Sequence, residues 1–154
     1  MKKELDRIDI KIISALQTNG RMTNVDLADK VGISAPPCLR RLRALEKAGY
    51  LTGYHADVDS AKLGFTVTVF AMVGLHSQAD KDLQAFEELV RSWPEVRECH
   101  MLNGDIDFIL KCVSEDLSSF QMFLTQKLTP APNVANVKTS LTIRQTKKQP
   151  GVPL

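Results

Sequence analysis

Apolar residues recur every three or four positions at the start of the chain. Leu5, Ile8, Ile12 and Leu16 form such a stripe and predict an opening helix. The stripe breaks at Asn19-Gly20, a pair typical of helix ends and turns. The sequence therefore predicts a helix over most of residues 5–18.

Two further helices are predicted before residue 50. Thr23 resembles the N-cap of a short helix that ends near Val31. Gly32 follows where a tight turn would need a positive φ. Ser34 can cap a third helix, which ends at Gly49. Three helices joined by a short glycine turn are typical of a helix-turn-helix.

The third helix is predicted to have one apolar and one basic side. Its two prolines, 36–37, fall in the first turn, where proline is tolerated. On a wheel of roughly 100° per residue, Arg43 and Lys47 lie within about 60° of Arg40, and Arg41 lies about 100° away. Either a solvated charged surface or a nucleic-acid-binding surface fits this pattern. The apolar side consists of Cys38, Leu39, Leu42 and Leu45.

The second half alternates between strand and helix patterns. Val137, Thr139, Leu141 and Ile143 alternate with polar residues, which indicates a strand. Asn103-Gly104-Asp105 is typical of a hairpin turn. The predicted order is βαββαβ, a ferredoxin-like sheet with two helices on one face, and the chain is α+β. Strands are predicted at 65–75, 96–102, 106–113 and 134–144, and helices at 80–92 and 116–128.

These patterns divide the chain into two domains. Residues 1–52 form the helix-turn-helix (winged-helix-like) domain, 53–64 a connecting strand and linker, 65–148 the ferredoxin-like domain, and 149–154 a flexible tail. The sheet face without helices should need a cover, which favours self-association.

Charge is distributed unevenly between the two parts. Residues 1–55 hold ten Lys/Arg and six Asp/Glu, a net of +4; residues 56–154 hold ten and twelve, a net of −2. A basic front third suggests nucleic acid as a partner.

Several other chemistries find no support in the sequence. Cys38, Cys99 and Cys112 are an odd, scattered set without disulfide or metal-ligand spacing. We find no nucleophile–base pair and no phosphate-binding glycine loop. The most apolar run, 67–75, is too short to cross a bilayer, and no signal sequence opens the chain. We expect a cytoplasmic protein that is not an enzyme and uses no cofactor or metal.

The N-terminal sequence resembles a known family. Its motifs are an opening Leu-Asp-x-x-Asp, a Val-Gly-Ile-Ser turn, a Pro-Cys-Leu-x-Arg helix and a Gly-Tyr-Leu-x-Gly-Tyr exit. Together they look like the Lrp/AsnC (leucine-responsive, feast/famine) transcription regulators, whose second domain is a βαββαβ amino-acid sensor. The resemblance covers nearly all of residues 5–145.

This resemblance implies double-stranded DNA as a partner and a helix-turn-helix over about Asn24 to Arg43. Pro36 replaces the Thr or Ser often found there, and Arg40 stands where many members are acidic, which alters the expected target sequence. With Lys47 added from the basic side, the predicted DNA-binding residues are Asn24, Ser34, Pro36, Arg40, Arg41, Arg43 and Lys47.

The resemblance also implies an amino-acid effector bound between paired sensing domains, near the family's Gly-Asp-x-Asp turn. Two carboxylates could hold an α-ammonium group and nearby N–H groups an α-carboxylate; the same residues also suit a plain hairpin turn. The predicted effector residues are Met101, Asn103, Gly104, Asp105, Ile106, Asp107, Thr129, Pro132 and Val134.

Three functions remain open at this point. The first is a transcription regulator that binds its operator as a homodimer, with tetramers or octamers as further assemblies. The second is an enzyme, since a fold does not fix a function. The third is an interaction module whose helices bind protein, for which partner binding would depend only weakly on salt.

Overall fold

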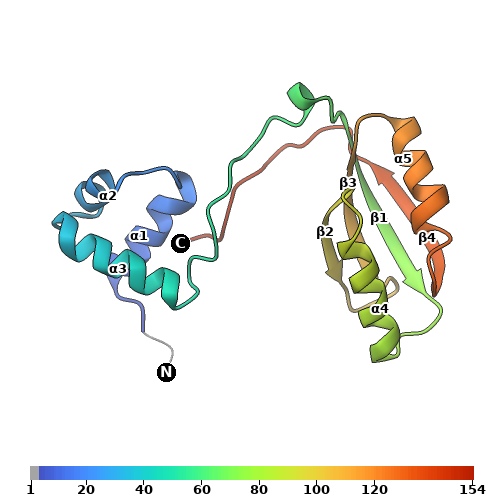
Figure 1. Ribbon diagram of the computed structural model, residues 1–154, viewed down its shortest axis with the longest axis horizontal. Coiled ribbons are helices and arrows are strands. Elements are labelled where there is room, and N and C mark those ends of the chain that lie inside the picture. The colour runs from blue at the N-terminus through green and yellow to red at the C-terminus, as the bar shows by residue number, and fades with distance from the viewer. Residues whose placement is uncertain (1–3) are drawn as a thin grey trace. The chain divides into compact units, whose positions relative to one another are not determined.

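The computed structural model describes residues 4–154, which form two compact units (Figure 1). The first unit runs to Asp57 and also takes in Lys147–Leu154. The second unit spans Val58–Thr146. The chain passes from the first to the second after Asp57, within the segment predicted as the connector.

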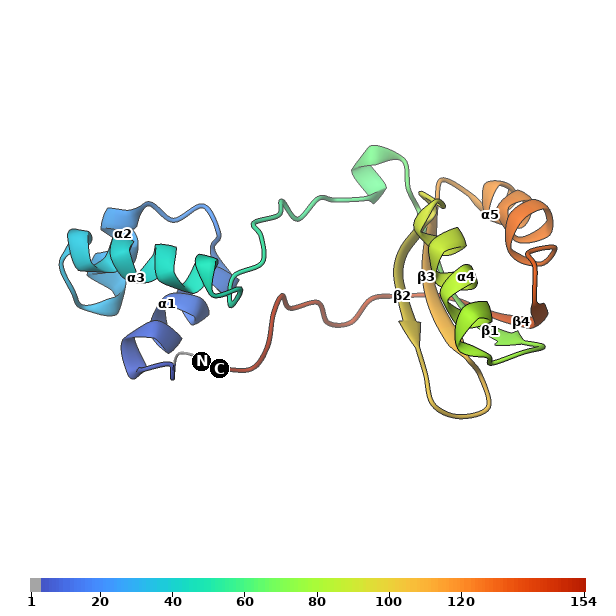
Figure 2. The same cartoon turned by 60° about the horizontal axis from the view of Figure 1, so that its bottom comes forward.

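Three helices build the first unit: α1 (Arg7–Thr18), α2 (Asn24–Val31) and α3 (Ala35–Lys47) (Figure 2). The Asp6 carboxylate caps α1 by accepting the N–H groups of Ile8 and Asp9, both at 2.9 Å. These helices enclose a small apolar core in which Ile12, Cys38 and Leu45 are fully buried.

The turn between α2 and α3 depends on Gly32. Thr23 caps α2 by accepting the Asp26 N–H at 3.1 Å. At the other end Gly32 has φ 80°, a left-handed conformation that side chains disfavour. Its N–H bonds to the carbonyls of Ala28 and Asp29, so the chain reverses at once into α3. The predicted helix-turn-helix geometry is present.

The predicted strand between residues 53 and 64 does not form. This segment contains only one 3₁₀ turn, η1 (Ala61–Leu63). Lys148 of the C-terminal segment pairs with Asp57, but within residues 4–154 no backbone hydrogen bond joins residues 53–59 to another segment, and a strand exists only by such pairing. The predicted C-terminal tail has a partner instead: Gln17 and Val152 exchange two hydrogen bonds, at 3.1 and 2.6 Å.

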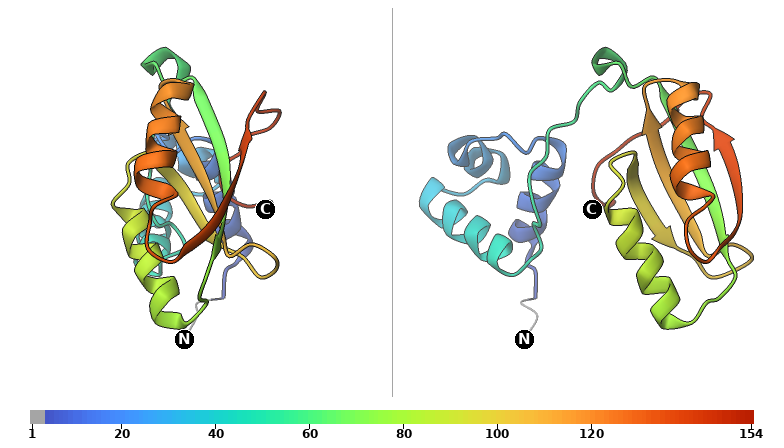
Figure 3. Two further views of the ribbon diagram at one scale, coloured as in Figure 1. Left: turned by 90° about the vertical axis from the view of Figure 1, so that its right-hand side faces the viewer. Right: turned by 45° about the vertical axis from the view of Figure 1, so that its right-hand side comes forward.

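The second unit is an antiparallel sheet in the order β2-β3-β1-β4. Both helices lie on one face of the sheet, as Figure 3 shows. This is the predicted ferredoxin-like βαββαβ arrangement, and the α+β class is confirmed. The elements are β1 (Val67–Leu75), α4 (Asp80–Arg91), β2 (Val96–Met101), β3 (Phe108–Ser114), α5 (Leu117–Phe123) with a π-turn (Leu124–Leu128), and β4 (Val134–Leu141).

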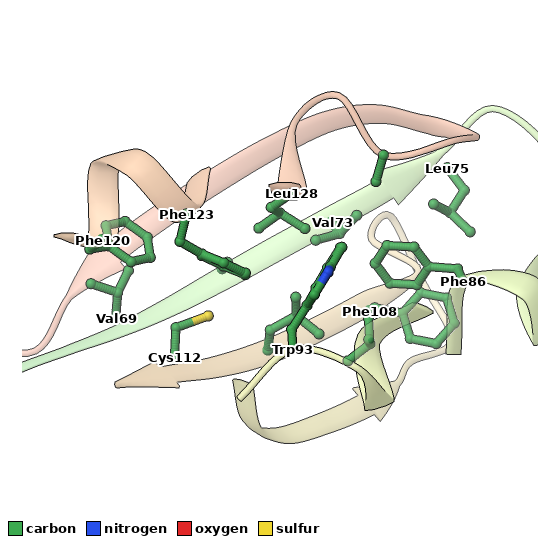
Figure 4. Packing of buried hydrophobic residues seen from close by; sticks show 14 residues of the cluster. Val69, Val73, Leu75, Phe86, Trp93, Phe108, Cys112, Phe120, Phe123 and Leu128 are labelled. Carbon is green, nitrogen blue, oxygen red and sulfur yellow. The ribbon is translucent and has the colours of Figure 1, made fainter. Parts of the chain in front are cut away.

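The core of this unit is aromatic. Phe86 of α4 contacts the ring of Phe108 at a centroid distance of 4.9 Å, and Trp93 meets Phe123 edge to face at 5.5 Å (Figure 4). Alternate residues of β3 point into this core, beginning with Phe108. The helices and the sheet are thus held by one cluster, in which Leu128 is also fully buried.

Two predicted boundaries are wrong, for the same physical reason. The strand predicted to reach residue 144 ends at Leu141, and Ile143 is 99% exposed. The hairpin predicted around residues 103–105 is a wider loop, because β2 ends at Met101 and β3 starts at Phe108. In both places pairing goes one residue beyond the strand and then stops, with the Thr142 N–H donating to the Thr68 carbonyl at 2.9 Å and the Leu102 N–H to the Asp107 carbonyl at 2.8 Å. A strand ends where its ladder of backbone hydrogen bonds ends, whatever the sequence pattern beyond it.

Candidate DNA interface and effector site

The basic side of α3 faces solvent. Arg40, Arg43 and Lys47 are all exposed, and none of them forms an ion pair or side-chain hydrogen bond within residues 4–154. On the opposite side of the helix, Cys38 and Leu45 are fully buried. The helix therefore presents three unneutralised cations on a rigid support, an arrangement suited to phosphate or to guanine edges.

Ser34 and Pro36 lie at the exposed start of the same helix. Ser34 is the N-cap residue, yet its hydroxyl makes no capping hydrogen bond. The side chain of an N-cap residue bonds to the second or third N–H of its helix. Here those positions are Pro36 and Pro37, which have no N–H, so the predicted capping bond cannot form. The Ser34 hydroxyl remains available to a ligand.

Asn24 and Arg41, two of the predicted DNA contacts, are engaged inside the unit. The Asn24 amide donates to the Ala35 carbonyl at 2.9 Å, which joins the start of α2 to the start of α3. The Arg41 guanidinium contacts the carboxylates of Asp6 at 2.6 Å and Asp9 at 2.9 Å. Asp9 is fully buried, so Arg41 connects α3 to the interior of α1.

This contact shifts the pKa of both Asp6 and Arg41. The pKa of Asp6 is lowered, chiefly by the N–H of Asp9 and then by the Arg41 guanidinium. The pKa of Arg41 is raised, chiefly by its hydrogen bond to Asp6. Both acids lie at the start of α1, Asp6 as its N-cap and Asp9 in its first turn. Arg7 and Lys11 are closer to these acids along the chain, so nothing in the sequence pointed to Arg41 as their partner.

The loop between β2 and β3 is held by Asp107. Its carboxylate accepts the Leu75 N–H at 2.6 Å and the Gln78 amide at 3.4 Å, and its own N–H donates to the Val73 carbonyl. Asp107 thus joins the loop to the end of β1 and is already hydrogen-bonded. Asp105, in contrast, is exposed.

A second loop reaches the same end of the sheet through Asn133, which has a left-handed φ of 68°. Its side chain bonds to both the N–H and the carbonyl of Ser77, at 2.9 and 2.8 Å, and its carbonyl accepts the His76 N–H. The 102–107 loop and the 129–134 loop therefore both dock on residues 75–78. Effector residues were predicted in both loops, but no sequence pattern indicated the contacts of Ser77, Gln78 and Asn133 that join them.

Most predicted effector residues lie on this joint surface. Met101, Asn103, Gly104, Thr129 and Pro132 are exposed. Ile106 and Val134 are half-buried. Within residues 4–154 there is no group of three or more His, Cys, Asp or Glu side chains that could hold a metal ion, and no helix is both long and apolar enough to cross a membrane.

Known proteins match both units. Residues 5–52 match the model of winged helix-turn-helix DNA-binding domains, and residues 68–152 match that of the Lrp/AsnC ligand binding domain. The chain belongs to the Lrp/AsnC family of transcription regulators. The family resemblance inferred from the sequence motifs is confirmed.

Individual relatives match this Lrp/AsnC regulator over nearly its whole length. It is 53% identical over 147 residues to the leucine-responsive regulatory protein of Rhizobium meliloti, covering 96% of this chain and 94% of that protein. It is 42% identical to the Bkd operon transcriptional regulator of Pseudomonas aeruginosa, covering 98% and 99%. The structure of the regulator NMB0573 from Neisseria meningitidis in complex with L-Met has a TM-score of 0.92 and 35% identity, covering 97% of both chains.

The family settles the choice among the three functions. This Lrp/AsnC protein is a transcription regulator with a DNA-binding helix-turn-helix and a ligand-binding domain, and not an enzyme. The family match assigns no individual side chain of this chain to DNA binding or to effector binding.

Proposed function

We propose that this Lrp/AsnC regulator binds operator DNA with the exposed side of α3 and the turn before it. The observation that carries the proposal is the set of three exposed, unpaired cations, Arg40, Arg43 and Lys47. Ser34 and Pro36 complete the surface at the start of the helix. Asn24 and Arg41, whose polar groups bond within the unit, support the surface from behind.

The experiment that tests this surface is a DNA-binding assay on the full-length protein. An operator is first selected from a random duplex library, and its affinity is then measured over a range of salt concentrations. We expect Arg40→Ala/Arg43→Ala to weaken binding at least about thirtyfold, since a good contact by each arginine contributes roughly 1–3 kcal/mol. Arg7→Ala/Lys11→Ala, which removes two exposed cations from α1, is the control with matched charge.

Unchanged affinity in the double variant would exclude α3 as the recognition helix. A shallow salt dependence in the wild type would contradict phosphate contacts by these cations, because phosphate contacts release counterions and make affinity fall steeply with salt.

We further propose that an amino acid is the effector and that it binds at the joint surface of the 102–107 and 129–134 loops. The similar Neisseria meningitidis protein was crystallised with L-Met, and the Rhizobium meliloti relative is named leucine-responsive. Asp105 is exposed there for an ammonium group. A thermal-shift screen of the twenty amino acids tests the proposal, with Asp105→Asn as the variant that should lose the response.

Self-association completes the proposal: we expect a homodimer, with tetramers or octamers built from it. The sheet face without helices carries Phe70, Met72, Ile109 and Val113, which are only partly covered in the single chain. Two copies packed through this face would remove that apolar surface from water. Because the operator lies on the chromosome, we place the working protein in the cytoplasm.

A further inference from the structure

A cleft of about 310 Å³ opens between α4 and the edge strand β2, away from the 102–107 and 129–134 loops except at Met101. Charged residues line part of it, and its accessible apolar floor consists of Val96, Cys99 and Met101. This volume lies at the lower end of the range of ligand pockets, roughly 300–1,000 Å³, which suits a small molecule.

Two charged side chains at this cleft have no partner. Glu87 of α4 is half-buried, and Arg97 of β2 is exposed. Neither forms an ion pair or side-chain hydrogen bond within residues 4–154, either with the other or with a third residue. Their neighbours differ in this respect: Arg91 is paired with Glu88, and Glu98 with Lys111.

The backbone directs Arg97 away from the regular strand pattern. Val96 lies opposite Cys112 and Glu98 opposite Lys111, so Arg97 is the extra residue of a β-bulge. Bulges turn a side chain out of the normal alternation, often beside functional sites. Glu87 approaches the cleft from the helix: its charge, together with burial, raises the pKa of the Cys99 thiol to about 11. Burial is the larger of these two causes.

We propose that this cleft binds a free α-amino acid with an apolar side chain, as a second ligand site in the sensing unit. Glu87 holds the ammonium group, Arg97 the carboxylate, and the side chain packs on Val96, Cys99 and Met101. One acid and one base, unpaired beside an apolar floor, match the two charges and the apolar body of such a zwitterion. Of the residues predicted for the loop site, Met101 alone also lines this cleft.

Cys99 provides a local readout because it lines the cleft and is partly exposed. The other two cysteines, Cys38 and Cys112, are fully buried. The rate at which N-ethylmaleimide alkylates Cys99 in the native full-length protein, located by peptide mass spectrometry, therefore reports on occupancy of this cleft. The probes are L-leucine, L-isoleucine, L-valine, L-methionine and L-phenylalanine.

We expect at least one of these amino acids to slow alkylation of Cys99. The concentration giving half protection should rise at least about tenfold in Glu87→Gln and in Arg97→Gln, each compared with its own unliganded rate. Glu88→Gln, one residue along the same helix, is the matched control and should leave protection unchanged. Asp105→Asn should also leave it unchanged, because that residue belongs to the loop site.

Four outcomes would overturn the proposal. They are no protection by any of the five amino acids, protection that survives in both cleft variants, protection that is lost in Asp105→Asn, and equal protection by an N-acetylated amino-acid amide. The third would mean that Cys99 responds to the loop site, and the fourth would mean that the charges play no part. A thermal shift that depends on Asp105 can still be present in each case, so failure here is distinct from failure of the loop site.

Discussion

Ser34 shows how two neighbouring prolines change the role of a single residue. At an ordinary helix start its hydroxyl would satisfy a backbone N–H and stabilise the fold. Because the positions that would offer that N–H are Pro36 and Pro37, the hydroxyl is not used by the helix. The prolines themselves fix the first turn of α3 without needing a side-chain cap.

Replacing Ser34 should therefore separate DNA binding from stability. We expect Ser34→Ala to change the free energy of unfolding by less than about 0.5 kcal/mol, as an ordinary surface substitution does, while it weakens operator binding severalfold. Thr23→Ala is the control, since Thr23 does make its capping bond, and it should cost about 1 kcal/mol. Urea unfolding and gel shifts measure the two effects. An equal loss of stability in both variants would contradict this account.

Asp6 makes part of the stability depend on pH. Its pKa is lowered in the folded protein from the ordinary 3.8 by the Asp9 N–H and by Arg41. A carboxyl with a depressed folded pKa contributes stability above its unfolded pKa and loses it as pH falls through the folded value. We expect wild type to exceed Asp6→Asn in stability at pH 6 and the difference to shrink below about pH 4. A difference independent of pH between 6 and 2.5 would refute this.

At the scale of elements, Arg41 joins two helices that share few other polar contacts. Its guanidinium crosses from α3 to the carboxylates at the start of α1. The adjacent Arg40 points to solvent without a partner. One arginine therefore holds the recognition helix in place, and its neighbour is free to contact DNA.

The two arginines should differ in the salt dependence of DNA binding. Arg40→Ala should reduce the slope of log affinity against log salt by about 0.9 for a lost phosphate contact. Arg41→Ala should leave the slope unchanged and lower the thermal unfolding midpoint instead. Binding isotherms at four salt concentrations, with thermal melts of both variants, distinguish the two. A reduced slope in Arg41→Ala would return that residue to the interface.

At the scale of the whole molecule, the sheet face without helices is an apolar surface that folding of the second unit leaves partly uncovered. Ile109 and Phe70 lie on it, on adjacent strands, facing away from α4 and α5. The sheet cannot cover both of its faces with only two helices on one side, so a second copy is the simplest cover.

A charge placed on this face should prevent dimerisation. Ile109→Glu would bury an unpaired carboxylate in each copy of the dimer, at a cost of about 3–5 kcal/mol each. Size-exclusion chromatography with light scattering should show a smaller species than for wild type. Val25→Glu, which alters an exposed apolar residue on α2, is the control and should keep the wild-type mass. A mass unchanged by Ile109→Glu would exclude this face as the interface.

The sequence alone determined the features that depend on neighbours along the chain. Helices α1 to α3, the left-handed Gly32 and the βαββαβ order follow from apolar spacing, caps and turn residues, all of which are local. The basic side of α3 could be predicted for the same reason, since the positions of side chains around a helix depend only on sequence separation.

Only the tertiary structure decided how distant residues pair. Arg41 links α3 to α1 because the carboxylates of Asp6 and Asp9 lie beside it in space. The Asp107 carboxylate is hydrogen-bonded because the end of β1 lies next to it. The segment 53–64 has a strand-like sequence but no strand beside it. The partners of Arg41 and Asp107 are far away in sequence, and residues 4–154 contain no strand that pairs with 53–64. No local sequence pattern could reveal either fact.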